Sequence, residues 1–114
     1  MTYIVLITLV LSIVNADRAD HGCEPLVLGH RMRVEAQHHT REMVRAGYLF
    51  HSDLQPGEGE VVGGTARTVR HLMRSFYRSP EHRRVLRACW LHRIGAGYVS
   101  RDGVIWLTLR LRAP

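Results

Sequence analysis

The chain has 114 residues, of which 46% are apolar and 23% charged, a composition that suits one globular domain over residues 1–114 and argues against intrinsic disorder. All sixteen basic residues are arginine, and the formal net charge is +6. A positive surface attracts polyanions, but the arginines are spread from Arg18 to Arg112 and form no block. Nucleic acid is therefore not the expected partner.

The chain begins with an apolar run over residues 3–14. This run is shorter than the ~20 apolar residues that a membrane-spanning helix needs, so no transmembrane span is predicted. It is compatible with the apolar part of a residual signal or anchor segment, because Val14-Asn15-Ala16 resembles a cleavage site. It is equally compatible with a buried first helix that continues through Arg18. No basic residue precedes the run, which favours the helix.

A second helix is predicted from Leu28 to Ala46, because apolar or small residues recur there at helical spacing. Gly47 is a natural stop for it. His39 lies on the apolar stripe of this helix, a position typical of a buried histidine with a structural role.

The middle of the chain changes character after a short apolar stretch, Tyr48–Phe50. Prolines and glycines between residues 53 and 64 predict a loop. Thr65 or Thr68 then opens a helix that carries Phe76, and Ser79-Pro80-Glu81 has the cap, the proline and the acidic residue that begin a further short helix, to about Ala88.

The last part of the chain has the two-residue period of β-strands. We predict strands over Ile94–Val99 and Val104–Leu111, joined by a hairpin turn at Asp102-Gly103. In the second strand one face is apolar and should face the core; it consists of Ile105, Leu107, Leu109 and Leu111.

Six short strings in a fixed order carry a family resemblance that covers the chain from about residue 10. They resemble the patterns N-A-x-R, A-x-x-H-x-x-x-M, G-F/Y-x-x-H-S/T, G-E-N, S-P-x-H-R and I-G-x-G of the bacterial, SCP-like branch of the CAP superfamily (cysteine-rich secretory protein, antigen 5 and pathogenesis-related 1). In this chain the strings begin at Asn15, Ala36, Gly47, Gly59, Ser79 and Ile94. The resemblance implies an α/β fold of CAP type, an α-β-α sandwich in which helices flank a small antiparallel sheet with a C-terminal hairpin.

The resemblance bears on the first helix and on the two cysteines. It places N-A-x-R inside the first helix, so the apolar start is expected to belong to the fold. From the residues alone, Cys23 and Cys89 fit a disulfide and two reduced core thiols equally well. Bacterial relatives with cysteines at these places carry a bridge, which implies a Cys23–Cys89 disulfide and an oxidising, extracellular or cell-envelope location.

The resemblance also implies a cleft formed by His51, Glu60 and His82, with His39 nearby. Two imidazoles and a carboxylate suit a divalent cation such as zinc, or general acid–base chemistry, and they also suit a purely structural hydrogen-bond network. Two departures remove polar groups from the cleft. The asparagine of G-E-N is replaced by Val61, so that Glu58 competes with Glu60 as the family's glutamate, and Leu107 follows Trp106 where relatives carry a threonine. The segment 52–59 is also short.

Three functions follow as hypotheses. The first is an exported, monomeric binding or effector module that presents the cleft to a lipid or sterol, a cation or a cell-envelope component. The second is a metal-dependent hydrolase that uses the same His/Glu cleft, and the third is a structural envelope domain without a working site. H-E-x-x-H, G-x-S-x-G and P-loop motifs are absent, and Glu35-x-x-His38 is half of a di-iron motif that has no second copy.

Overall fold

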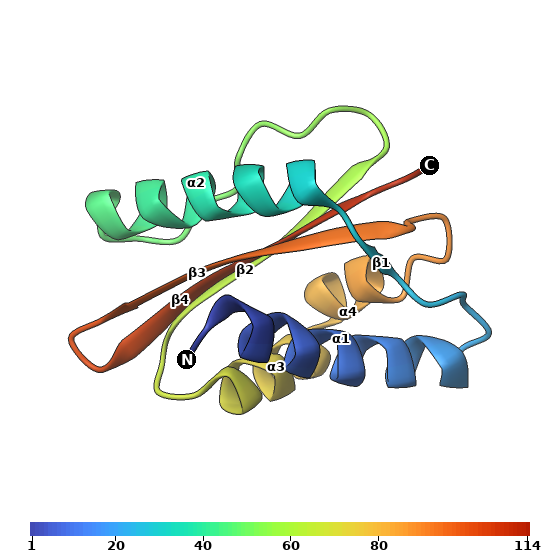
Figure 1. The fold of residues 1–114 in the computed structure, drawn as a ribbon, viewed down its shortest axis with the longest axis horizontal. Helices are drawn as coiled ribbons and strands as arrows, with labels where there is room; N and C mark the ends of the chain where they lie inside the picture. The colour runs from blue at the N-terminus through green and yellow to red at the C-terminus, as the bar shows by residue number, and fades with distance from the viewer.

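The structure is a computed structural model that describes residues 1–114, with four helices and one four-stranded sheet (Figure 1). The strand order is β1-β3-β4-β2, and only the β1–β3 pair is parallel. The elements in chain order are α1 (Tyr3–Asp20), β1 (Val27–Leu28), α2 (His30–Ala46), β2 (Glu58–Ala66), α3 (Val69–Arg78), α4 (Pro80–Leu86), β3 (Arg93–Arg101) and β4 (Val104–Arg112).

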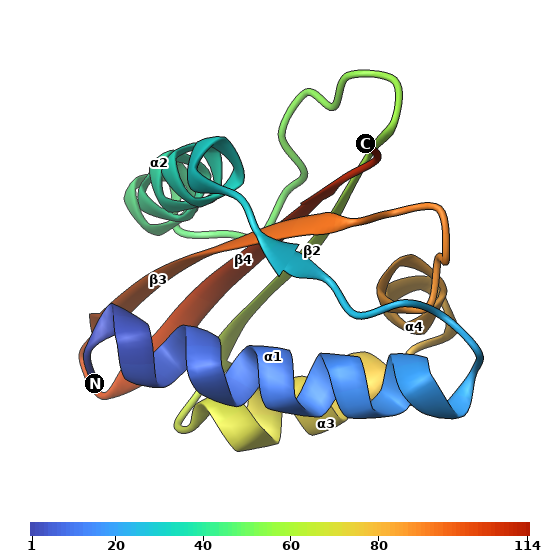
Figure 2. The ribbon, with the colours of Figure 1, turned by 45° about the vertical axis from the view of Figure 1, so that its right-hand side comes forward.

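The sheet lies between two layers of helices. Helix α2 covers one face, while α1, α3 and α4 cover the other (Figure 2). This confirms the predicted α-β-α sandwich with its C-terminal hairpin. The hairpin turn is at Asp102-Gly103, where both residues have positive φ, 54° and 77°.

The main core fills the space between the sheet and the α1/α3/α4 layer. Leu107, Leu109 and Leu111 of β4 are fully buried there, as their alternation predicts. Helix α1 contributes further fully buried side chains, among them Leu6 and Val10. In this structure the apolar start of the chain is therefore a packed helix. No helix of the structure is long and apolar enough to cross a membrane.

On the other face, α2 packs directly against the backbone of β3. A Cβ atom added at Gly97 would overlap the carbonyl group of Ala36, and one at Gly95 would overlap the α2 backbone at Arg33. The I-G-x-G string therefore lets a helix lie unusually close to the sheet. The predicted start of α2 at Leu28 is two residues early, because Val27–Leu28 pair with β3 as β1.

The prediction of a loop from 53 to 64 is wrong for its second half, because β2 begins at Glu58 and pairs with β4. Gly57 still lies in a turn, with a φ of 83°, but glycines within β2 make room for side chains of the helices. A Cβ atom at Gly63, for example, would lie 2.7 Å from side-chain atoms of Leu72 and Phe76 in α3. Thr68, and not Thr65, caps α3 and accepts a hydrogen bond from the His71 amide.

The predicted disulfide between Cys23 and Cys89 is present, with a Cα–Cα distance of 4.9 Å and a sequence separation of 66. It joins the segment after α1 to the connection between α4 and β3. A bridge that closes so long a loop stabilises a domain by about 2–4 kcal/mol, chiefly by restricting the unfolded chain.

Arg18, from the N-A-x-R string, forms a clamp beside the disulfide. Its side chain is fully buried and meets no carboxylate. Its guanidinium instead donates four hydrogen bonds of 2.9–3.0 Å to backbone carbonyls, those of Glu24, Leu86, Ala88 and Leu91. The clamp therefore ties α1 to the two segments that the disulfide also joins.

Candidate functional site

Glu60 is the centre of a buried polar network on the α2 side of the sheet. It lies in β2 directly opposite Arg110 of β4, and its side chain is 0% exposed. One carboxylate oxygen accepts hydrogen bonds from the Ser52 amide and from His51 Nδ1, both at 2.9 Å. The other accepts a short hydrogen bond from the Ser52 hydroxyl. Glu60 thereby fixes the loop between α2 and β2 against the sheet.

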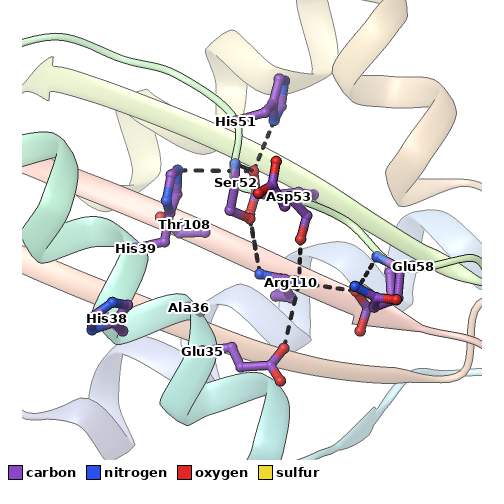
Figure 3. A network of polar contacts seen from close by, with 12 residues as sticks. Glu35, Ala36, His38, His39, His51, Ser52, Asp53, Glu58, Thr108 and Arg110 are labelled. Atoms are coloured by element: carbon purple, nitrogen blue, oxygen red, sulfur yellow. Dashed lines mark hydrogen bonds and ion pairs between the residues drawn. The ribbon is translucent and has the colours of Figure 1, made fainter.

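Arg110 connects this network to Glu58 and to α2. Its guanidinium donates to Glu58 and to the Ser52 hydroxyl, both at 2.9 Å, and lies 3.7 Å from Glu60 and 3.5 Å from Glu35 (Figure 3). Burial opposes the ionisation of Glu58, but hydrogen bonds from the Gln55 amide and from Arg110 outweigh it and lower the pKa of Glu58. The network therefore holds the Glu58 carboxylate in its charged form.

His39 supports the same loop from α2. Its side chain is 2% exposed, and its ring packs edge-on against Phe50. The Phe50 carbonyl accepts a 2.6 Å hydrogen bond from Nε2, which therefore carries the proton. His39 Nδ1 has no hydrogen-bond partner. The expected structural histidine is thus satisfied at one ring nitrogen only.

His82 lies on another side of β2, in the first turn of α4. Its ring faces a hollow of about 240 Å³ between the Tyr48–Phe50 stretch, β2 and α3, which Leu49, Leu72 and Phe76 help to line. Burial and the neighbouring His51 lower the pKa of His82, so the imidazole is neutral at pH 7. The Val62 backbone and Glu81 act on this pKa in the opposite direction, and Nδ1 has no hydrogen-bond partner.

The structure thus brings only part of the predicted set into contact. His51 and Glu60 form a pair, Glu58 joins them through Arg110, and His39 Nε2 lies 4.0 Å from Glu60. No group of three or more His, Cys, Asp or Glu side chains is arranged to hold a metal ion. Both oxygens of Glu60 accept hydrogen bonds within the chain, and His51, Glu60 and His82 are not arranged as a metal site in this structure; zinc binding by this set stays a prediction.

Two residues that matter here, Ser52 and Arg110, were not predicted. Arg110 alternates with the core leucines of β4, and a charged residue at such a position is normally taken to face solvent. It is buried because α2 covers that face. The nearest signal in the sequence was the pair of glutamates at 58 and 60, which need a buried cation if β2 is a covered strand.

Most arginines are scattered over the surface, as expected, with one exception. Arg70, Arg74 and Arg78 follow the exposed side of α3 and line a hollow with Ile13 of α1. The helix periodicity, and not a run in the sequence, gathers this charge.

A comparison against family models agrees with these features: the arrangement of the helices, the disulfide, and the close packing of α2 at the I-G-x-G string. The model of the cysteine-rich secretory protein family, CAP, matches residues 11–108. The chain belongs to this family. No curated protein matches the chain.

Solved structures show the same fold for this CAP chain. An outer surface protein of Borrelia burgdorferi superposes with a TM-score of 0.86 at 11% identity, covering 99% of this chain and 96% of that one. An extracellular protein of Bacillus anthracis that contains an SCP domain superposes with a TM-score of 0.82 at 16% identity. The match covers 94% of this chain and 40% of the Bacillus chain. At these identities the likeness establishes the fold alone.

Proposed function

We propose that this CAP domain is an extracellular binding module whose cleft at His82 takes the polar end of an apolar ligand, such as a lipid of the cell envelope. The observation that carries this proposal is the neutral His82 ring, whose Nδ1 has no partner and which stands beside Leu49, Leu72 and Phe76 in one hollow. The extracellular setting is supported by the disulfide and by the outer-surface and extracellular proteins that share the fold.

The tautomer of His82 decides what the cleft recognises. Nδ1 has no partner, and in the neutral ring that is protonated at the other nitrogen it keeps its lone pair and accepts a hydrogen bond. Apolar surroundings strengthen such a hydrogen bond, since water competes less for it there. The matching ligand group is a hydroxyl or an amide N–H attached to an apolar body.

The order of contacts around Glu60 argues for binding over hydrolysis. In a nucleophilic triad the imidazole stands between the serine and the carboxylate, so that it can take the serine proton. Here the carboxylate of Glu60 stands between Ser52 and His51, and the Ser52 hydroxyl donates to Glu60. Ser52 therefore has no imidazole in contact with it, and the carboxylate that accepts its hydrogen bond also accepts from the Ser52 amide and from His51, an arrangement that suits holding the loop.

The proposal is tested by titrating the domain with monooctanoylglycerol below its micellar concentration and following amide and ring signals by NMR. We expect saturable shifts at His82 and at the residues around it. His82→Leu keeps the side-chain volume and removes the acceptor, so its affinity should fall about fivefold or more, in line with the loss of one hydrogen bond.

The matched control is His30→Ala, which removes an exposed histidine at the start of α2. Its titration should equal that of the wild type. A wild-type protein that shows no saturable shift, or a His82→Leu variant that binds as well as the wild type, would rule out this cleft as the binding site. A parallel zinc titration addresses the hydrolase alternative: tight one-to-one binding that His51→Ala abolishes would favour it.

A further inference from the structure

A second cavity lies on the other side of the Glu60 network, between α2 and the loop at Ser52. Its volume is about 290 Å³, and it shares no lining residue with the hollow at His82. One face of α2 supplies four of its polar side chains, at positions i, i+3, i+4 and i+7. These are Glu35, His38 and His39, which Figure 3 shows, and Glu42.

Three buried polar atoms that border this cavity have no hydrogen-bond partner. They are Glu35 Oε2, His39 Nδ1 and Arg110 Nε. The side chains of His39 and Arg110 are 2% and 7% exposed. Buried polar groups nearly always have a partner, so these three atoms call for a molecule in the cavity.

The atoms show which kind of group is missing. His39 donates through Nε2 to the Phe50 carbonyl, so its Nδ1 is an acceptor. Glu42 lies 3.6 Å from that nitrogen and has a carboxylate, another acceptor. Arg31 donates to Oε1 of Glu35, whereas Oε2 lies 3.5 Å from the Arg110 guanidinium, has no hydrogen bond, and can accept one. Three acceptors therefore border one small space.

The charge around the cavity also favours a donor, because it is negative. Among the residues that line this cavity there are two carboxylates, those of Glu35 and Glu42, and one guanidinium, that of Arg110. With neutral histidines the formal sum is −1, whereas the whole chain carries +6. The cavity is thus a negative spot on a positive protein, and a cation is the favoured guest.

From these contacts we infer that the cavity between α2 and Ser52 binds a primary ammonium group that has an oxygen acceptor close by, as in an amino alcohol or an α-amino acid. The ammonium has three N–H donors for Glu35 Oε2, His39 Nδ1 and Glu42. The neighbouring oxygen accepts from Arg110 Nε. A quaternary ammonium has no N–H to donate, and no Trp, Tyr or Phe side chain lines the cavity to receive it.

Calorimetric titration of the full chain at pH 7.5 with ethanolamine, glycine and choline tests this inference. Ethanolamine or glycine should bind saturably, and choline at least about tenfold more weakly, as expected for the loss of charge-assisted hydrogen bonds. The decisive variant is Glu42→Gln, because Glu42 is half-exposed and its replacement should leave the fold intact. It should weaken binding at least about tenfold.

Glu24→Gln, an exposed carboxylate far from the cavity, is the matched control and should bind as the wild type. His82→Leu should also keep ethanolamine binding, which separates this site from the proposed cleft. Cosedimentation with phosphatidylethanolamine vesicles, but not with phosphatidylcholine vesicles, would identify the source as a lipid headgroup; binding of the free amine alone would identify a small soluble ligand. The inference is overturned if neither amine binds, if choline binds equally well, or if Glu42→Gln has no effect.

Discussion

The two buried arginines of this domain have opposite surroundings. Arg18 meets only neutral carbonyls, and four of its N–H groups have partners at 2.9–3.0 Å. Arg110 lies within 4 Å of three carboxylates, Glu35, Glu58 and Glu60, and its Nε has no partner. The first region is complete within the chain, while the second borders a cavity and has polar atoms left over.

This difference separates scaffold from site. A closed network such as that of Arg18 adds stability and has nothing to offer a ligand. An open network such as that of Arg110 costs stability and persists where a ligand, or water in its place, completes it.

The largest effect should come from Arg18→Leu. The substitution removes the clamp and leaves four carbonyls without their donor, so the free energy of unfolding should fall by about 5 kcal/mol. The partners are neutral, so the loss should be the same at pH 7 and at pH 4. Urea unfolding measures it, with exposed Arg45→Leu as a control that changes little. A loss that shrinks strongly in acid would mean that Arg18 acts through a carboxylate after all.

Arg110→Leu should cost about 3–4 kcal/mol at pH 7, because buried carboxylates lose their cation. Here the pH dependence has a definite sign. The pKa of Glu58 is lowered in the folded protein, so its contribution is present above the unfolded pKa of about 4.3 and is lost as the pH falls through the folded value. The difference between wild type and variant should therefore shrink below about pH 4. A constant difference in urea unfolding across this range would contradict the ion-pair account.

Replacing both cysteines, Cys23→Ser with Cys89→Ser, should lower the free energy of unfolding by about 2–4 kcal/mol. The bridge joins the same segments as Arg18, so the two losses should not be additive. A double-mutant cycle with Arg18→Leu measures this coupling. Additive losses within about 0.5 kcal/mol would show that the clamp and the bridge act independently.

Replacing His82 should have the smallest effect, a change only in the slope of stability against pH. Its folded pKa is lowered, so the unfolded chain binds the extra proton first, and stability should fall as the pH drops below the unfolded value of about 6.5. His82→Gln removes the titrating ring and should flatten the profile between pH 7 and 5.5. An unchanged slope in thermal unfolding would show that another histidine causes it.

Sequence patterns were most informative where they act locally or recur across the family. The Asp102-Gly103 turn and the alternating leucines of β4 are both present as predicted. Helix α4 also begins at Pro80 with Ser79 in the N-cap position, although the Ser79 side chain makes no capping hydrogen bond. The cysteine pairing came from the resemblance alone.

The features that were not predicted depend on contacts between residues far apart in the chain, which a single sequence does not display. Gly63 lies in a glycine-rich stretch that predicts a loop, but it makes room for Phe76, 13 residues later in the chain. Arg110 is buried only because α2 covers β4, and Arg18 finds its carbonyls about 70 residues away in α4 and after it. The S-P-x-H-R string led to the prediction of a cleft that His82 shares with His51 and Glu60, and this stays a prediction.

The most direct test of the contrast between scaffold and site is one NMR experiment that follows three side chains in the same sample: the rings of His39 and His82 and the Nε–H of Arg18. We predict that ethanolamine shifts His39 saturably, that monooctanoylglycerol shifts His82, and that Arg18 responds to neither. Unmoved histidines, or an Arg18 signal that shifts together with them, would contradict the division of this domain into a closed clamp and an open binding side.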